Sequence, residues 1–147
     1  MSRGLAILLG AGAGCLVGMQ APINSRLGKS IGAIQAASFS FLVGTVALVS
    51  ISFILRGGLG SFAKLGQVPW WALIGGLLGA VYVFVALEAV RTLGASGLTA
   101  VVITGQVVIS VVIDRFGLLG IAKTSIGPGR ILGLVLLVTG VLLVVRR

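Results

Sequence analysis

Charged side chains are scarce in this sequence, and histidine is absent. Only 9% of its 147 residues are charged, whereas a soluble domain typically carries roughly 25%. So few charges could not cover the surface of a soluble domain. The lone Cys15 excludes an internal disulfide and multi-cysteine metal sites, and the lack of histidine excludes histidine-based acid–base chemistry. Because paired carboxylates are missing as well, we expect neither an enzyme nor a metal or cofactor site.

Hydrophobic residues and glycine dominate what is present. The chain is 58% hydrophobic with 24 glycines, and its mean hydropathy is +1.24. Glycine is common in membrane helices because it lets their backbones approach closely. The formal net charge is +9, but the basic residues sit singly between apolar runs, as interfacial charges of membrane proteins do. We therefore expect a lipid bilayer as the surroundings and no nucleic-acid partner.

Five apolar runs approach or reach the length of about 20 residues that a helix needs to cross the hydrocarbon core. None of them has a charged residue near its middle. The sequence therefore predicts an all-α integral membrane protein, a bundle of five transmembrane helices in a single membrane domain, 1–147. The predicted helices cover residues 4–23, 31–55, 70–90, 95–116 and 131–145.

The links between these runs are too short to hold a domain, so any function must reside in the membrane bundle. They cover residues 24–30, 56–69, 91–94 and 117–130. At the N-terminus, Arg3 and the apolar run after it resemble the start of a signal peptide. However, glycine stands where a large apolar residue is usual, and the run continues past Cys15. We expect no cleavage there.

The basic residues are almost evenly divided between the two sides that five spans would define. One side carries six of them: Arg3, Arg56, Lys64, Arg115, Lys123 and Arg130. The other carries five: Arg26, Lys29, Arg91, Arg146 and Arg147. The positive-inside rule needs an asymmetry to act on, so this pattern favours dual topology and an antiparallel homodimer, the two-chain form of an inverted repeat. A weakly biased chain that inserts one way beside a partner is the alternative.

One face of the predicted helix 95–116 is polar. The residues on it follow a spacing of three and four, which places them together on a helix: Thr92, Ser96, Thr99, Ile103, Gln106, Ser110 and Asp114. A polar stripe in a membrane helix faces protein or water rather than lipid. Helix packing through Ser and Thr explains part of it. Gln106 lies mid-span with donors and an acceptor that need partners, so either packing or substrate contact remains open for it.

Further polar residues complete the candidate site. Pro22 frees a backbone carbonyl between Gln20 and Asn24, so this stretch is either a substrate site or a helix that ends at the interface. Packing is favoured for the polar residues of 31–55, and the Tyr82 hydroxyl needs a partner. The candidate substrate-binding residues are Gln106, Gln20, Asn24, Tyr82, Thr99, Ser110, Gln35 and Ser38. The glycines predicted to mark helix packing are Gly10, Gly14, Gly18, Gly75 and Gly79.

The two acidic residues lie near the ends of predicted spans. Glu88 precedes Arg91 by three residues, and Asp114 stands beside Arg115, so local ion pairs are expected at the interface. No carboxylate lies in the middle of a span, where proton-coupled export of cations usually needs one. The absence favours a neutral or anionic polar substrate, or one whose transport is coupled without a carboxylate. Whether either acid takes part in coupling stays open.

Several motifs along the chain resemble the YdcZ-type branch of the drug/metabolite transporter superfamily. They are QAPINSRLG (20–28), SFLVGT (40–45), PWWALIGG (69–76), GAVYV (79–83), RTLGA (91–95), GQ (105–106) and IDRFG (113–117), with a closing helix after residue 130. The resemblance implies a five-helix half-transporter that works by alternating access, with the ligand between two inverted halves. Small multidrug exporters of the same superfamily carry an essential acid in their first helix. This chain has none there, so their cation/proton mechanism is not carried over.

Together these observations predict a secondary transporter in a bacterial inner membrane, an antiparallel homodimer that moves a small polar solute. Its partner would be a second copy or a homologous chain. One alternative is a channel-like pore of the same architecture. Another is a non-transporting membrane subunit that pairs with a similar chain.

Overall fold

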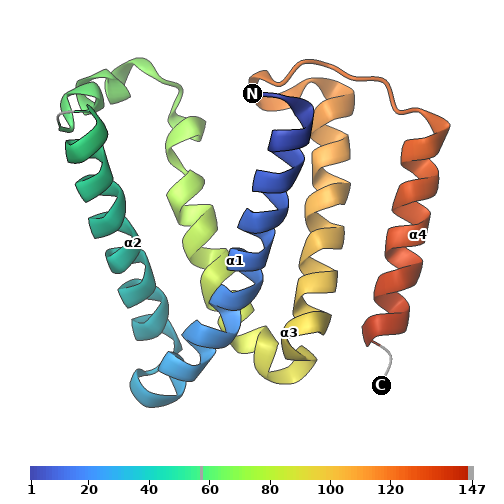
Figure 1. Cartoon of the computed structure of the whole chain (residues 1–147), viewed down its shortest axis with the longest axis horizontal. Coiled ribbons are helices and arrows are strands. Elements are labelled where there is room, and N and C mark those ends of the chain that lie inside the picture. Colours follow the sequence, from blue (N-terminus) through green and yellow to red (C-terminus); the bar gives the residue numbers. More distant parts are fainter. Residues whose placement is uncertain (57, 146–147) are drawn as a thin grey trace. The chain divides into compact units, whose positions relative to one another are not determined.

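A computed structural model describes residues 1–56 and 58–145, and this part of the chain is helical (Figure 1). The α-helices are α1 (Arg3–Ile31), α2 (Ala33–Arg56), α3 (Gly75–Phe116) and α4 (Pro128–Val145). Short 3-10 helices occupy the links: η1 (Gly60–Gln67), η2 (Trp70–Leu73) and η3 (Leu118–Gly120). The all-α prediction is confirmed. By length and composition, four of the described helices could cross a membrane. Arg146 and Arg147, which the charge count used, lie outside the described residues.

The first helix is longer than the sequence predicted, and the expected loop at 24–30 is wrong. α1 has 29 residues and runs through Pro22 to Ile31. Proline costs a helix one hydrogen bond, but its fixed φ is compatible with helical backbone. The helix ends at Gly32, whose φ of 92° is a conformation that suits glycine. The polar stretch stays helical because some of its side chains are buried against neighbouring helices, among them Asn24 and Ser25.

The third helix changes conformation at Gly94, where φ is 69° and ψ is 171°. α3 therefore consists of two helical segments, 75–93 and 95–116, each of about 20 residues, the length of one membrane crossing. The first begins at Gly75 rather than at Trp70, because the residues after Pro69 form the 3-10 helix η2. The second ends at Phe116 as predicted, where Gly117 takes a left-handed conformation.

The last helix, α4, begins at Pro128, three residues before the predicted start at 131. Proline is favoured in the first turn of a helix, where its missing N–H would have no partner anyway. The helix has 18 residues, none of them acidic, and extends to Val145 as predicted.

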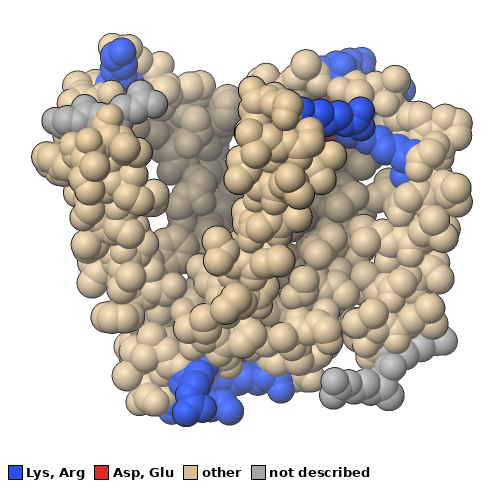
Figure 2. Space-filling view, in the orientation of Figure 1, with Lys and Arg blue, Asp and Glu red and all other residues tan. Residues whose placement is uncertain are grey.

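The chain divides into two compact units, Met1–Arg91 and Thr92–Arg147, which we call unit 1 and unit 2. Unit 1 contains α1, α2 and the first segment of α3, and its core lies where α1 leads into α2. The buried residues there come from all three helices: Ala21, Asn24, Ser25, Gly28, Ala36, Ala37, Val83, Ala86, Leu87 and Val90. Unit 2 contains the second segment of α3 and α4. Taken by itself, each unit shows its Lys and Arg side chains near the helix ends (Figure 2). The single-domain prediction stays a prediction.

Candidate functional site

A narrow cleft between α1 and α3 in unit 1 gathers three of the predicted polar residues. Its lining on α1 comprises Gln20, Ala21 and Asn24, and its lining on α3 comprises Tyr82, Val83 and Ala86. The spacing of three or four residues on each helix places these side chains on one face. The space between the two faces is too narrow to hold a water molecule. The structure thus brings Gln20, Asn24 and Tyr82 together, with no room for water among them.

Asn24 is the most buried polar residue of this cleft, at 5% exposure. Its Nδ2 donates a hydrogen bond to Oγ of Ser40 on α2, with an N–O distance of 3.2 Å. An amide removed from water needs such a partner, because an unsatisfied buried donor is costly. The bond therefore ties α1 to α2 and fixes the Asn24 carboxamide beside the cleft.

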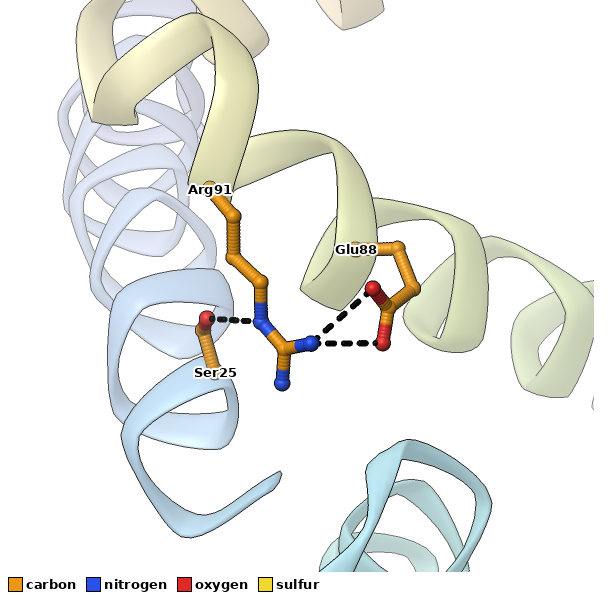
Figure 3. Close-up of polar contacts among 3 residues, drawn as sticks. All are labelled: Ser25, Glu88 and Arg91. Atoms are coloured by element: carbon orange, nitrogen blue, oxygen red, sulfur yellow. Dashed lines mark hydrogen bonds and ion pairs between the residues drawn. The ribbon is translucent and has the colours of Figure 1, made fainter. Parts of the chain in front are cut away.

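An arginine joins α1 and α3 beside the cleft. Nε of Arg91 donates to Oγ of Ser25 at 3.2 Å, and its Nη1 lies 3.0 Å from both carboxylate oxygens of Glu88 (Figure 3). The predicted Glu88–Arg91 ion pair is confirmed. The pair is partly exposed, with 32% of the Arg91 side chain and 44% of the Glu88 side chain accessible. We call Ser25, Glu88 and Arg91 the arginine cluster.

Gly28 lets α3 approach α1 closely at this cluster. A Cβ atom at Gly28 would lie 3.1 Å from Nη2 of Arg91 and 3.1 Å from a methyl carbon of Leu87. Leu87 is fully buried. Any larger side chain at Gly28 would push against both groups, so the glycine allows the guanidinium to lie close to α1.

The predicted residues of α2 lie elsewhere in unit 1. The carboxamide of Gln35 folds over Gly32, where a Cβ would come within 2.5 Å of Oε1. Gln35 is the third residue of α2, a position from which Gln often leans back over the start of its helix. Ser38 is exposed and lines an apolar groove of about 470 Å³ between α2 and α3, together with Phe41 and Phe84. Neither residue belongs to the cleft.

Unit 2 carries the polar stripe of the second α3 segment. Ser96 and Thr99 line a groove of about 650 Å³ between this segment and α4, whose other walls are mainly apolar. Ile103 also lines it, whereas Gln106 and Ser110 are exposed. Within the described part of the chain, no hydrogen bond joins the Gln106 side chain to another residue.

Asp114 does not pair with its neighbour Arg115 as the sequence suggested. Its Oδ2 lies 2.6 Å from Nη2 of Arg130, at the start of α4. The backbone carbonyl of Asp114 also accepts a hydrogen bond from the N–H of Thr124 at 2.8 Å. These two contacts hold the link between α3 and α4 against the end of α3. Adjacent side chains on a helix point in different directions, which explains why Arg115 is not the partner.

Comparison with known proteins identifies the family. The family described as "Putative inner membrane exporter, YdcZ" matches residues 5–143 of the chain. The chain belongs to the YdcZ family. Inner membrane protein YdcZ of Escherichia coli (strain K12) is 35% identical over 145 residues, which cover 97% of this chain and 95% of that protein. No solved structure matches the chain.

The YdcZ family membership confirms the resemblance inferred from the motifs. Together with the apolar helices, it establishes a multi-pass protein of the inner membrane. The family is one of membrane exporters rather than enzymes by its description. The QAPINSRLG stretch (20–28) that suggested the YdcZ branch supplies the α1 side of both the cleft and the arginine cluster.

The predicted packing glycines of this YdcZ-family chain differ in their surroundings. Gly79 lies close to Phe41, since a Cβ there would be 3.2 Å from Cζ of the ring. Among the described residues, nothing lies within 4 Å of a Cβ placed at the other four: Gly10, Gly14, Gly18 and Gly75. Their role in packing stays a prediction.

Sequence reasoning missed Ser25 and Gly28 as parts of the site. A signal for Gly28 was present, because Gln20, Asn24 and Gly28 are four residues apart and share one face of α1. This spacing was not recognised because the helix was expected to end near Ile23. No sequence pattern indicates that Arg91 reaches Ser25, because the two residues are 66 positions apart.

Proposed function

We propose that this YdcZ-family protein exports a small polar solute, neutral or anionic, by alternating access. The observation that carries the proposal is the cleft between α1 and α3, where Gln20, Asn24 and Tyr82 gather. Polar groups at membrane depth are costly and commonly mark substrate pathways. A carboxamide offers both donors and an acceptor, which suits hydroxyl, amide or carboxylate groups of a solute. The exporter description of the family supplies the direction.

The closure of the cleft favours alternating access over a permanently open pore. An open pore needs a continuous path for water, and the space among these side chains does not admit a water molecule. A transporter instead closes and opens its site in turn, with a conformational step between the two states. In this proposal, the structure represents the closed state of the site.

The charge of the site favours a neutral or anionic solute over a cation. None of the residues that line the cleft carries a carboxylate. The nearest acid along α3, Glu88, is already paired with Arg91. A cationic solute would thus enter the bilayer interior without a counter-charge, which is unfavourable in a low-dielectric setting.

The transporter is proposed to be an antiparallel homodimer of five-span subunits. The two segments of α3 separated at Gly94 are each long enough for one crossing, so α3 would contribute two spans. Gln106 is exposed on the polar face of the second α3 segment, and a bare carboxamide is disfavoured in lipid. A second copy or a water-filled cavity would cover it, and Ser110 and Thr99 lie on the same helical face.

Transport is tested with the full chain in proteoliposomes. The probes are labelled representatives of three solute classes: a sugar, a neutral amino acid and a monocarboxylate. We expect saturable flux of at least one probe, which Gln20→Leu and Tyr82→Phe reduce several-fold. Gln67→Leu, a matched change in the exposed link helix η1, should leave the flux unchanged. Flux that does not saturate would favour a pore, and absence of flux for every probe would favour a non-transporting subunit.

Topology is tested separately by thiol labelling in intact cells. Single cysteines are placed at Lys29, which is exposed near the end of α1, and after the last residue, in a Cys15→Ser background. Comparable labelling of each site from both sides of the membrane supports dual topology. If every copy faces one way, the antiparallel homodimer is wrong and a homologous chain must supply the opposite half.

A further inference from the structure

The closed cleft and the arginine cluster lie next to each other on the same two helices. On α1, Gly28, which lies against Arg91 of the cluster, follows the cleft residue Asn24 by four positions; on α3, Leu87, which lies against the same glycine, follows Val83 by four. Positions four apart lie one above the other on a helix. A separation of α1 from α3 wide enough to open the cleft would therefore also have to separate the contacts of the cluster.

The bond between Arg91 and Ser25 is distinctive in unit 1. In the part of the chain that the structure describes, it is the one side-chain hydrogen bond that joins α1 to α3. The other polar side-chain contact of α1 with a different helix runs from Asn24 to Ser40 on α2. Opening between α1 and α3 would break the first of these bonds and need not disturb the second.

Glu88 gives the Arg91 guanidinium a partner that stays with it when α1 moves. Glu88 lies on the same helix, three residues before Arg91, and its two oxygens lie 3.0 Å from Nη1. The bond to Ser25 uses a different atom, Nε. The guanidinium can thus release Ser25 and keep its ion pair, which avoids leaving an isolated charge near the membrane interior.

The contact between Arg91 and Ser25 is also weak enough to form and break reversibly. Arg91 and Glu88 are partly exposed, and ion pairs in that setting contribute little to stability. A single hydrogen bond to a charged group adds a modest amount. A contact of this strength biases an equilibrium between closed and open forms without locking it.

We propose that Arg91 is the latch of the cleft: its bond to Ser25 holds α1 against α3, and its release opens the space beside Gln20, Asn24 and Tyr82. Gly28 belongs to the latch because it allows the guanidinium to lie against α1. The solute that uses the opening depends on the proposed function. The opening itself does not.

The latch is tested by the water accessibility of a cysteine in the cleft. The reporter is Ala86→Cys in a Cys15→Ser background, because Ala86 lines the cleft and is only 3% exposed. The full chain in proteoliposomes is treated with a small water-soluble methanethiosulfonate reagent, which reacts with thiols that water reaches. Ser25→Ala and Arg91→Gln should each raise the labelling rate of this cysteine roughly three- to tenfold.

Matched controls separate the latch from general effects of charge or helix stability. Ser30→Ala and Arg26→Gln change the same residue types at exposed positions of α1 and should leave the labelling rate unchanged. Glu88→Gln retains the Ser25 bond, so its effect should be smaller than that of Arg91→Gln. Folding is monitored by thermal unfolding in detergent, in which the Ser25→Ala chain should keep a cooperative unfolding transition.

The labelling results show whether the latch exists, independently of whether transport is observed. Faster labelling in Ser25→Ala and Arg91→Gln with a retained cooperative unfolding transition supports the latch even if no probe is transported. Unchanged labelling in Ser25→Ala overturns it even if flux is observed. A rise of equal size in the Arg26→Gln control also overturns it, because loosening would then follow from loss of any charge at this end of α1.

Discussion

Gly28 and Arg91 lie so close together that a Cβ at Gly28 would be 3.1 Å from Nη2 of the arginine. The same hypothetical atom would touch Leu87, a fully buried side chain of unit 1. Arg91 and the core residue Leu87 therefore both lie against the α1 backbone at Gly28. The missing side chain of a single glycine therefore brings together the arginine cluster and the core beneath it.

A bulkier residue at Gly28 should destabilise unit 1. Gly28→Val places branched carbons against Leu87 and Arg91, and overpacking of this kind costs about 1–3 kcal/mol. Gly10→Val is the matched control, because Gly10 has open space around it and Gly and Val differ little in helix propensity. Thermal unfolding in detergent measures both. Equal melting temperatures for the two variants would contradict the close contact.

Loss of the Ser40 hydroxyl should also destabilise unit 1. Ser40→Ala leaves the buried Nδ2 of Asn24 without its acceptor, which costs about 1 kcal/mol in a membrane protein. Ser38 is two residues away, exposed and without a hydrogen bond to another described side chain. Ser38→Ala should therefore leave thermal stability unchanged. A larger loss for Ser38→Ala than for Ser40→Ala would show that the α1–α2 bond is not formed in the membrane.

Residues close in sequence made much of the fold predictable. The end of α3 at Phe116 follows from Gly117, and the Glu88–Arg91 pair follows from their spacing on one helix. The grouping of Gln20 with Asn24 follows from the same helical spacing. In each case the deciding contact lies within one or two helical turns, where periodicity and turn chemistry act directly.

Contacts between distant residues were not predictable in the same way. The length of α1 beyond Pro22 depends on the burial of Asn24 and Ser25 against other helices, which the local polarity of residues 24–30 obscures. Arg130 pairs with Asp114 across the whole link between α3 and α4. The sequence around Asp114 suggests Arg115 as its partner instead, because local sequence does not show which distant charged residue the fold brings close to Asp114.

The Asp114–Arg130 pair should contribute modestly to the stability of unit 2. Both side chains are partly exposed, at 25% and 43%, so Asp114→Asn and Arg130→Gln should each cost about 0.5–1 kcal/mol. The double variant should cost no more than the larger single change, because the two share one interaction. Arg115→Gln serves as the control and should have no effect. Thermal unfolding at low and high salt checks the pair, and additive losses would argue against it.

Gly94 should tolerate no side chain, because its backbone conformation is almost exclusive to glycine. With φ of 69° and ψ of 171°, it lies in a region where other residues are strained by roughly 1–3 kcal/mol. Nothing lies within 4 Å of a Cβ there, so the cost of Gly94→Ala would come from the backbone alone. Gly105→Ala, in the helical interior with equally open space, should instead be neutral or stabilising by up to about 1 kcal/mol. Thermal unfolding of both variants in detergent provides the comparison. If Gly94→Ala were as stable as Gly105→Ala, α3 would pass through residue 94 as a continuous helix and could not supply two membrane crossings.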